Sequence, residues 1–186
     1  MRAAVFLDRD GTLIEEVGYL DSLERLRLFP FSVDAVRLLN RAGFAVVVVT
    51  NQSGVARGYF DEPVVESTHR HLADVLARGG ARVDGFYYCP HHPDGRVAAY
   101  RMACDCRKPR PGLLLRAARE LNVALPRSFV VGDRAHDIAT GVNAGVRGVL
   151  VRTGYGRAHE AEAASSAAAV TDNLAQAVAW ILRHQR

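Results

Sequence analysis

The feature that most constrains the fold of this chain is a regular alternation of short apolar runs with amphipathic stretches of helical period. The apolar runs are rich in Val and Phe and nearly uninterrupted, which is typical of parallel strands buried on both faces of a sheet. They cover residues 3–7, 44–49, 86–89, 129–131 and 149–151, and the helical patterns cover 32–42, 62–78, 112–121, 136–144 and 172–183. The alternation predicts an α/β fold: a doubly wound parallel sheet in a single domain over residues 1–186, with small loop insertions and no large cap.

Two long segments fit neither a strand nor a helix, residues 15–30 and 90–110. Long loops in a compact domain are usually functional, so we expect both to lie over the substrate side of the sheet. The Ala-rich stretch at 161–169 is expected to be a surface connection or a short helix. On the predicted helices, His69 and His71 are expected at the surface and Trp180 in the core.

Composition predicts a soluble protein, and its basic balance suits a small anionic substrate. The net charge is +4, and the Lys and Arg residues are scattered rather than gathered in a tract, so nucleic acid is the weaker interpretation. The longest apolar run, residues 44–49, is far short of the roughly 18 residues that span a bilayer. An odd number of cysteines, three, and the absence of an export signal predict a reducing cytoplasm without a disulfide framework. We also expect a monomer.

Polar residues cluster where the predicted strands end. Asp8 and Asp10 follow the first strand, Thr50 ends the second, and Asp133 follows the fourth, with Asp137 one helical turn later. A single Asp in such a place often only caps a turn, but the ends of parallel strands meet at one edge of a sheet. Three carboxylates gathered there would repel one another, and Mg²⁺ with oxygen ligands would relieve the repulsion.

All three cysteines lie in the second long loop. Cys89, Cys104 and Cys106 with one histidine form a Cys₃His set, the composition of a closed tetrahedral zinc site. His91 is preferred to His92 as the fourth ligand. Four protein ligands leave no open position, so the sequence predicts a structural zinc ion that folds the loop and holds Arg107 and Lys108 near the active site.

The string Phe6-Leu7-Asp8-Arg9-Asp10-Gly11-Thr12 resembles the first motif of the haloacid dehalogenase (HAD) superfamily. Thr50, Lys108, and Gly132-Asp133 with Asp137 match its other three motifs in order, and the resemblance covers nearly the whole chain. It implies a phosphatase in which Asp8 attacks phosphorus and Asp10 acts as general acid and base. It also implies that Thr50 and Lys108 hold the phosphoryl group, and that Asp8, Asp133 and the backbone carbonyl of Asp10 bind Mg²⁺.

Within that superfamily, Cys89-Pro90-His91-His92-Pro93, Cys104-Asp105-Cys106-Arg107-Lys108-Pro109 and residues 50–58 resemble the heptose 1,7-bisphosphate 7-phosphatase family. The resemblance implies removal of the phosphate at carbon 7 of a sugar bisphosphate that serves heptose and lipopolysaccharide precursor synthesis. The substrate-binding residues it implies are Glu16, Val17, Gly18, Tyr19, Thr50, Asn51, Gln52, Ser53, Arg107, Lys108 and Arg134. Glu16 stands where the family tends to have Asp, and Arg134 where it commonly has Lys.

Three alternatives stay open at this point. One is a phosphatase that acts on histidinol phosphate or on another small phosphate ester; histidinol phosphate lacks the second phosphate and carries an amine, which Glu15 or Glu16 would attract. A binding module without activity would typically have lost Asp8 or Asp10. A nucleic-acid 3′-phosphatase would need a basic groove and would bind DNA in a salt-sensitive way.

Overall fold

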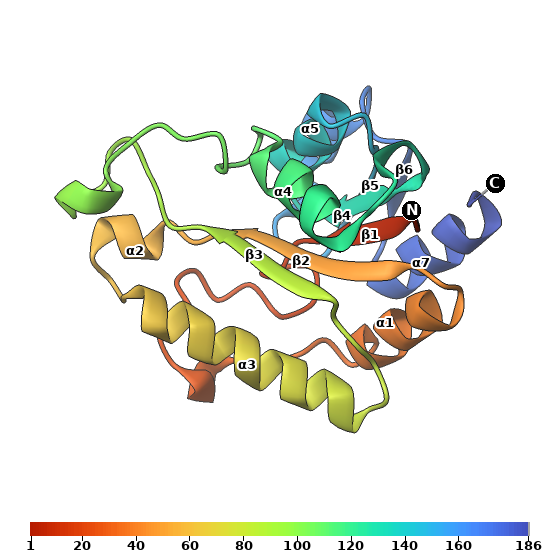
Figure 1. The fold of residues 1–186 in the computed structure, drawn as a ribbon, viewed down its shortest axis with the longest axis horizontal. Helices are drawn as coiled ribbons and strands as arrows, with labels where there is room; N and C mark the ends of the chain where they lie inside the picture. The colour runs from red at the N-terminus through yellow and green to blue at the C-terminus, as the bar shows by residue number, and fades with distance from the viewer. Residues whose placement is uncertain (186) are drawn as a thin grey trace.

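A computed structural model describes residues 1–185 of the chain, which form a six-stranded parallel sheet in the order β3-β2-β1-β4-β5-β6 (Figure 1). The strands are β1 Ala4–Leu7, β2 Ala45–Asn51, β3 Gly85–Cys89, β4 Phe129–Gly132, β5 Arg147–Val151 and β6 Ala169–Thr171. Every neighbouring pair is parallel, and in β1 Val5 pairs with Val46 of β2 and with Phe129 of β4. The predicted doubly wound α/β fold is confirmed for the described residues.

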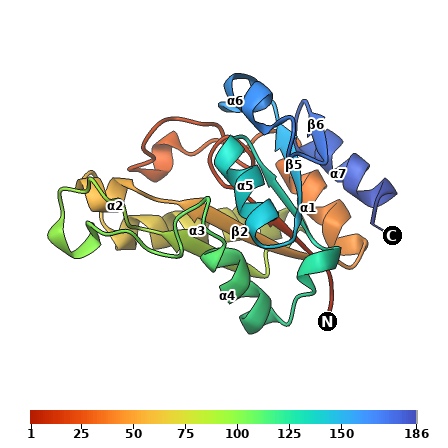
Figure 2. The ribbon, with the colours of Figure 1, turned by 90° about the horizontal axis from the view of Figure 1, so that it is seen from above.

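Helices cover both faces of the sheet (Figures 1 and 2). They are α1 Ser32–Arg41, α2 Gly54–Arg57, α3 Glu62–Arg78, α4 Gly112–Leu121, α5 Ala135–Asn143, α6 Gly156–Ala163 and α7 Leu174–Arg183, with 3₁₀ turns at Leu23–Arg25, Ala98–Tyr100 and Leu125–Arg127. Val5 and Leu7 of β1 pack with α1, α3 and α7, whereas Ala4 and Phe6 pack with α4 on the other face. Successive strand residues point to opposite faces, so a strand covered on both sides must be apolar throughout.

The order of the strands brings the polar strand ends together. The chain passes from β1 outward to β2 and β3, and then returns to place β4 on the other side of β1. Loops after β1 and β4 therefore diverge to opposite sides of the sheet, and such a switch point is where open α/β sheets bind ligands. Asp8 and Asp133 each follow one of these two strands.

Several expectations about single elements needed correction. The sequence did not predict β6 or the short α2. The Ala-rich stretch at 161–169, expected as a surface connection or a short helix, holds the end of α6 and the first residue of β6. His69 was predicted at the surface, which is wrong: it is only 6% exposed. It shares the buried stripe of α3 with Val65, Leu72 and Leu76, which recurs every three or four residues. His71 on the same helix is half-buried, and Trp180 packs partly buried against the core.

Two further expectations remain predictions, the monomeric state and the cytoplasmic location. Among residues 1–185, no helix has both the length and the apolar character needed to cross a membrane. The predicted single domain ends at Arg186, which lies outside the described residues.

Candidate active site

A cavity of about 320 Å³ opens at the carboxyl ends of the strands. Its walls come from the loop after β1, the end of β2 with α2, the loop that precedes α4, and the first turn of α5. The residues that line it are Asp8, Asp10, Glu16, Gly18, Tyr19, Leu20, Thr50, Asn51, Gln52, Ser53, Gly54, Phe60, Arg107, Lys108, Arg134, His136 and Tyr155. Of the residues predicted to act on substrate, only Val17 does not line this cavity, because its side chain packs against the core.

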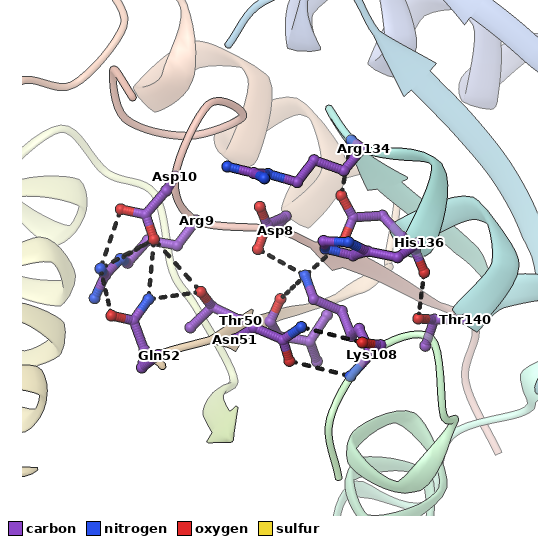
Figure 3. A network of polar contacts seen from close by, with 12 residues as sticks. Asp8, Arg9, Asp10, Thr50, Asn51, Gln52, Lys108, Arg134, His136 and Thr140 are labelled. Atoms are coloured by element: carbon purple, nitrogen blue, oxygen red, sulfur yellow. Dashed lines mark hydrogen bonds and ion pairs between the residues drawn. The ribbon is translucent and has the colours of Figure 1, made fainter. Parts of the chain in front are cut away.

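Lys108 joins two carboxylates at the floor of the cavity (Figure 3). Its ammonium lies 2.7 Å from Asp8 Oδ1 and 2.6 Å from Asp137 Oδ1, and it donates to the carbonyl of Val49 at 3.0 Å. Burial is the largest single effect on the pKa of Lys108 and lowers it, but Asp137 and Asp8 outweigh burial and raise the pKa. The lysine is therefore a fixed positive charge beside Asp8.

The backbone of Lys108 is held from the end of β2. The side-chain amide of Asn51 accepts a hydrogen bond from Lys108 N at 3.0 Å and donates one to Lys108 O at 3.2 Å. The two bonds connect the loop before α4 to the strand that ends beside the cavity. Asn51 was predicted to contact substrate, and here its amide fixes the position of the lysine.

A third carboxylate, Asp133, lies close to Asp8 and Asp137. It is fully buried, its Oδ2 accepts from Tyr155 N at 2.8 Å, and its Oδ1 has no hydrogen-bond partner among the described residues. Oxygens of Asp8, Asp133 and Asp137 lie within 4.8 Å of one another. Both oxygens of Asp137 are engaged, Oδ1 by Lys108 and Oδ2 by Arg134 N, whereas Lys108 contacts only Oδ1 of Asp8. The unpartnered oxygen of Asp133 and the carboxylate of Asp8 are therefore the groups left to bind a cation.

The protonation of these two carboxyls also suits a bound cation. Burial, ahead of all other effects, raises the pKa of Asp8 to about 7 and that of Asp133 to about 8, and the two groups repel each other. A divalent cation between them would stabilise both charged forms. The donor set, which consists of carboxylate oxygens, is the kind that Mg²⁺ prefers.

Asp10 lies on another wall of the cavity with its carboxylate held by side chains (Figure 3). Gln52 Nε2 donates to Asp10 Oδ2 at 2.9 Å and to Thr50 Oγ1 at 2.8 Å. Arg9 Nε and Nη2 donate to the two oxygens of Asp10 at 3.1 and 3.0 Å. Asp10 thus reaches the cavity with its carboxyl group held in position, separate from the ion pair of Asp8 and Lys108.

Two arginines give the cavity further positive charge. Arg134 Nη2 lies 3.3 Å from Glu16 Oε2, and its guanidinium lies 4.0 Å above the ring of Tyr155. Arg107 donates to the carbonyl of His91 at 3.2 Å, which connects it to the cysteine-rich loop. The cavity can therefore receive one anionic group at Lys108 and a second at the two arginines.

The predicted Cys₃His set comes together in the structure. The three sulfur atoms lie 3.1 to 3.4 Å apart, and His91 Nδ1 lies 3.4 Å from the sulfur of Cys106. Hydrogen bonding with Cys89 lowers the pKa of Cys106 to about 5, whereas hydrogen bonding with Cys106 raises the pKa of Cys89 and burial raises that of Cys104. Cys106 is therefore the thiol that most readily takes the thiolate form, the form that binds metal. Four donors of this kind within 4.8 Å fit a tetrahedral zinc ion.

Sequence reasoning missed several residues of this site, including His136, Tyr155, Phe60 and the buried Arg9. His136 and Tyr155 have a signal that was available, because each follows the end of a strand by a few residues. Arg9 has none, since a charged residue between two aspartates gives no indication that it is buried.

Comparisons with known proteins agree with this geometry. A family model described as "HAD-hyrolase-like" matches residues 105–177. Proteins of Yersinia pestis and Escherichia coli (strain K12), both named D-glycero-beta-D-manno-heptose-1,7-bisphosphate 7-phosphatase, are each 46% identical over 164 residues. Those residues are 87% of this chain in both cases, and 87% and 85% of the respective relatives.

A solved structure extends the similarity to the whole fold. The D,D-heptose 1.7-bisphosphate phosphatase of B. bronchiseptica, complexed with magnesium and phosphate, superposes with a TM-score of 0.87 at 34% identity and covers 99% of both chains. With the sequence relatives, this similarity covers the strand ends that carry Asp8, Thr50 and Asp133. The members of the D-glycero-beta-D-manno-heptose-1,7-bisphosphate 7-phosphatase family are phosphoric monoester hydrolases of the HAD superfamily, and this chain belongs to that family.

Proposed function

We propose that this chain hydrolyses the C7 phosphate of D-glycero-D-manno-heptose 1,7-bisphosphate through a phosphorylated Asp8 and leaves the C1 phosphate in place. The observation that carries the proposal is the pairing of Asp8 with Lys108 at 2.7 Å in a cavity that also presents Arg107 and Arg134. The names of the Yersinia and Escherichia relatives specify the β-anomer, which supports the β-anomer as the preferred substrate.

Charge repulsion is the first obstacle to the reaction. A carboxylate that approaches a phosphate dianion at about 4 Å meets repulsion of roughly 8 kcal/mol at an effective dielectric constant near 20. The ammonium of Lys108 opposes that repulsion from its position between Asp8 and Asp137. Asp8 then attacks phosphorus in line, and the bond from phosphorus to the sugar oxygen breaks.

Asp10 carries out the proton transfers of the reaction. It donates a proton to the departing sugar oxygen, so that a neutral alcohol leaves rather than an alkoxide. The resulting carboxylate accepts a proton from the water that attacks the phosphorylated Asp8, which restores both carboxyl groups. Thr50 lies beside Asp10 at 3.5 Å and lines the cavity where the phosphoryl oxygens would lie.

Magnesium fits the carboxylate site at Asp8 and Asp133, and zinc fits the Cys₃His site. Asp8, Asp133 and the backbone carbonyl of Asp10 would hold Mg²⁺, which supplies Lewis-acid stabilisation of the charge on the phosphoryl group. Cys89, His91, Cys104 and Cys106 would hold Zn²⁺ in a closed site without an open position for substrate. The zinc site is thus structural, and it shares its loop with Arg107 and Lys108.

The second phosphate accounts for substrate selection. Arg107 and Arg134 would bind the C1 phosphate, while histidinol phosphate has no group for these arginines and brings an amine instead. Glu16, which an amine would need, is already paired with Arg134. The geometry therefore favours the bisphosphate.

The proposal is tested by phosphate release from both anomers of heptose 1,7-bisphosphate and from histidinol phosphate, with and without Mg²⁺. We expect Mg²⁺-dependent release of one phosphate from the β-anomer, with slower turnover of the α-anomer and of histidinol phosphate. Equal or faster hydrolysis of histidinol phosphate would keep the mechanism and overturn the substrate. Undiminished turnover without a divalent cation would overturn the metal assignment.

A further inference from the structure

The largest fully buried side chain in the described part of the molecule is charged. Arg9 is 1% exposed although it lies between the two catalytic aspartates. A guanidinium removed from water is costly unless its N–H groups are paired. Arg9 meets that requirement with acceptors from three different segments: its own loop, the loop after β2, and helix α3.

The arrangement of these acceptors fixes Asp10. Arg9 Nε and Nη2 reach the two carboxylate oxygens of Asp10 at 3.1 and 3.0 Å, and Nη2 also donates to Gln52 Oε1 at 3.0 Å. A planar guanidinium that contacts both oxygens restricts rotation of the carboxylate plane. Gln52 closes the arrangement, because its amide nitrogen donates to Asp10 Oδ2 (Figure 3).

Behind Arg9 lies His69 of α3. Its Nε2 is 3.4 Å from Arg9 Nη1, and its ring stacks on Phe86 at 4.9 Å and meets Tyr88 edge-on at 5.7 Å. Because arginine stays protonated, Nε2 must accept this hydrogen bond, which requires a neutral imidazole. Burial first, and the charge of Arg9 second, lower the pKa of His69 to about 3, so the neutral form is the one present near pH 7.

We propose that Arg9 is a positioning residue for Asp10, and that His69 and Gln52 hold Arg9 in place. This inference rests on the proposed function, in which Asp10 donates a proton to the leaving oxygen. A displacement of about 1 Å in a reacting group can reduce a rate about 10²-fold. A lysine at position 9 would keep the positive charge, but its single ammonium cannot reach both oxygens of Asp10, Gln52 and His69 together.

The test compares two leaving groups in the magnesium-loaded full chain. The sugar oxygen of heptose 1,7-bisphosphate needs a proton as it leaves, whereas the nitrophenolate of p-nitrophenyl phosphate leaves without one. For Arg9→Lys we expect kcat/KM to fall about 10²-fold for the heptose bisphosphate and less than about 3-fold for the aryl phosphate. In an Asp10→Asn background, Arg9→Lys should cause no further loss for the heptose bisphosphate, because it acts through Asp10.

Two variants at His69, which leave Arg9 itself unchanged, test the same inference if Arg9→Lys does not fold. His69→Leu removes the acceptor for Arg9 and should lower kcat/KM for the heptose bisphosphate about 5-fold, while the aryl phosphate is unaffected. His69→Gln retains a hydrogen-bond acceptor for Arg9 and should keep kcat/KM for the heptose bisphosphate near the wild-type value. His71→Leu on the same helix serves as the control. A circular dichroism melt of each variant shows which ones fold.

The outcomes distinguish a failure of the positioning role of Arg9 from a failure of the proposed function of Asp10. If Asp10→Asn leaves the ratio of the two kcat/KM values unchanged, the proposed role of Asp10 fails. If Asp10→Asn changes the ratio but the folded Arg9 and His69 variants do not, only the inference fails. Equal losses on both substrates in those variants would also overturn it, because a general structural defect does not distinguish leaving groups.

Discussion

The chemical role of Asp8 can be tested separately from any role in folding, because the neighbouring Lys108 does not depend on Asp8 alone for its ion pairs. Its carboxylate pairs with Lys108, but Lys108 keeps a second partner, Asp137, at 2.6 Å. Asparagine has nearly the same shape as aspartate and cannot be phosphorylated. We therefore expect Asp8→Asn to reduce kcat at least about 10³-fold with little change in melting temperature.

The measurement is phosphate release together with thermal unfolding of the same preparation. Asp74→Asn, an exposed position on α3, is the matched control and should retain full activity. Turnover by Asp8→Asn within about 10-fold of the wild type would contradict the covalent mechanism.

The metal site depends on a glycine that contributes no side chain. Gly11 has φ of +79°, and a Cβ placed on it would lie 2.2 Å from Asp133 Oδ2. Gly11→Ala must therefore displace the carboxylate proposed to bind Mg²⁺. We expect a rise of about 10-fold or more in the Mg²⁺ concentration that gives half-maximal activity.

Gly43 supplies the matched control for this substitution. Its φ is +84°, but a Cβ there would meet nothing within 4 Å. Gly43→Ala should carry a similar backbone cost, about 1 kcal/mol, without a change in the Mg²⁺ requirement. An equal Mg²⁺ requirement in the two variants would show that Gly11 matters only for backbone conformation.

At the scale of elements, the cysteine-rich loop connects the proposed zinc site to Lys108. The two histidines in this loop differ in their surroundings. His91 Nδ1 faces the sulfur of Cys106, whereas His92 accepts from Asp94 N at 3.1 Å and lies 3.3 Å from Arg57 Nη2. We expect His91→Gln to lose bound zinc and His92→Gln to retain about one zinc per chain.

Elemental analysis of the purified variants gives the zinc content, and limited proteolysis reports the order of the loop. Loss of zinc should release residues 90–110 for cleavage and reduce activity, because Lys108 lies in the same segment. Equal zinc content in His91→Gln and His92→Gln would remove His91 from the ligand set.

The sequence predicts elements well where burial on both faces enforces an apolar run. The strands that carry the site were found within a residue or two for this reason. β6, only three residues long, was missed because its strand conformation depends on pairing with β5 rather than on its own residues. Helix α6 was anticipated only at its C-terminal end, where the Ala-rich stretch was expected to be a surface connection or a short helix. The helix has no strong amphipathic pattern that would show where it begins.

The structure brings together the site residues that were predicted at strand ends, whereas the residues that support them were not predicted. Asp8, Thr50 and Asp133 are placed by chain topology, which a βα alternation determines. The burial of Arg9 depends on Gln52 and His69, which are 43 and 60 positions away in the sequence. Such a contact exists only after α3 has packed, so no local pattern reports it.

At the scale of the whole molecule, the buried imidazole of His69 makes stability depend on pH. Its pKa is lowered from 6.5 to about 3 in the folded chain, first by burial and then by Arg9, while the nearby Asp10 opposes the shift. Between those two pH values the unfolded chain binds a proton at His69 that the native chain does not. The free energy of unfolding therefore falls as the pH decreases through this range and is fully retained above pH 6.5.

Comparison of the wild type with His69→Gln isolates this contribution, because glutamine does not titrate and the other groups are common to both proteins. Between pH 7.5 and pH 5 the wild type should lose about 2 kcal/mol more unfolding free energy than His69→Gln, since each pH unit below 6.5 removes about 1.4 kcal/mol. Urea unfolding at the two pH values measures the difference. The same loss in both proteins would mean that native His69 binds a proton over this pH range as readily as the unfolded chain does, and an imidazole protonated in this way could not accept the hydrogen bond from Arg9.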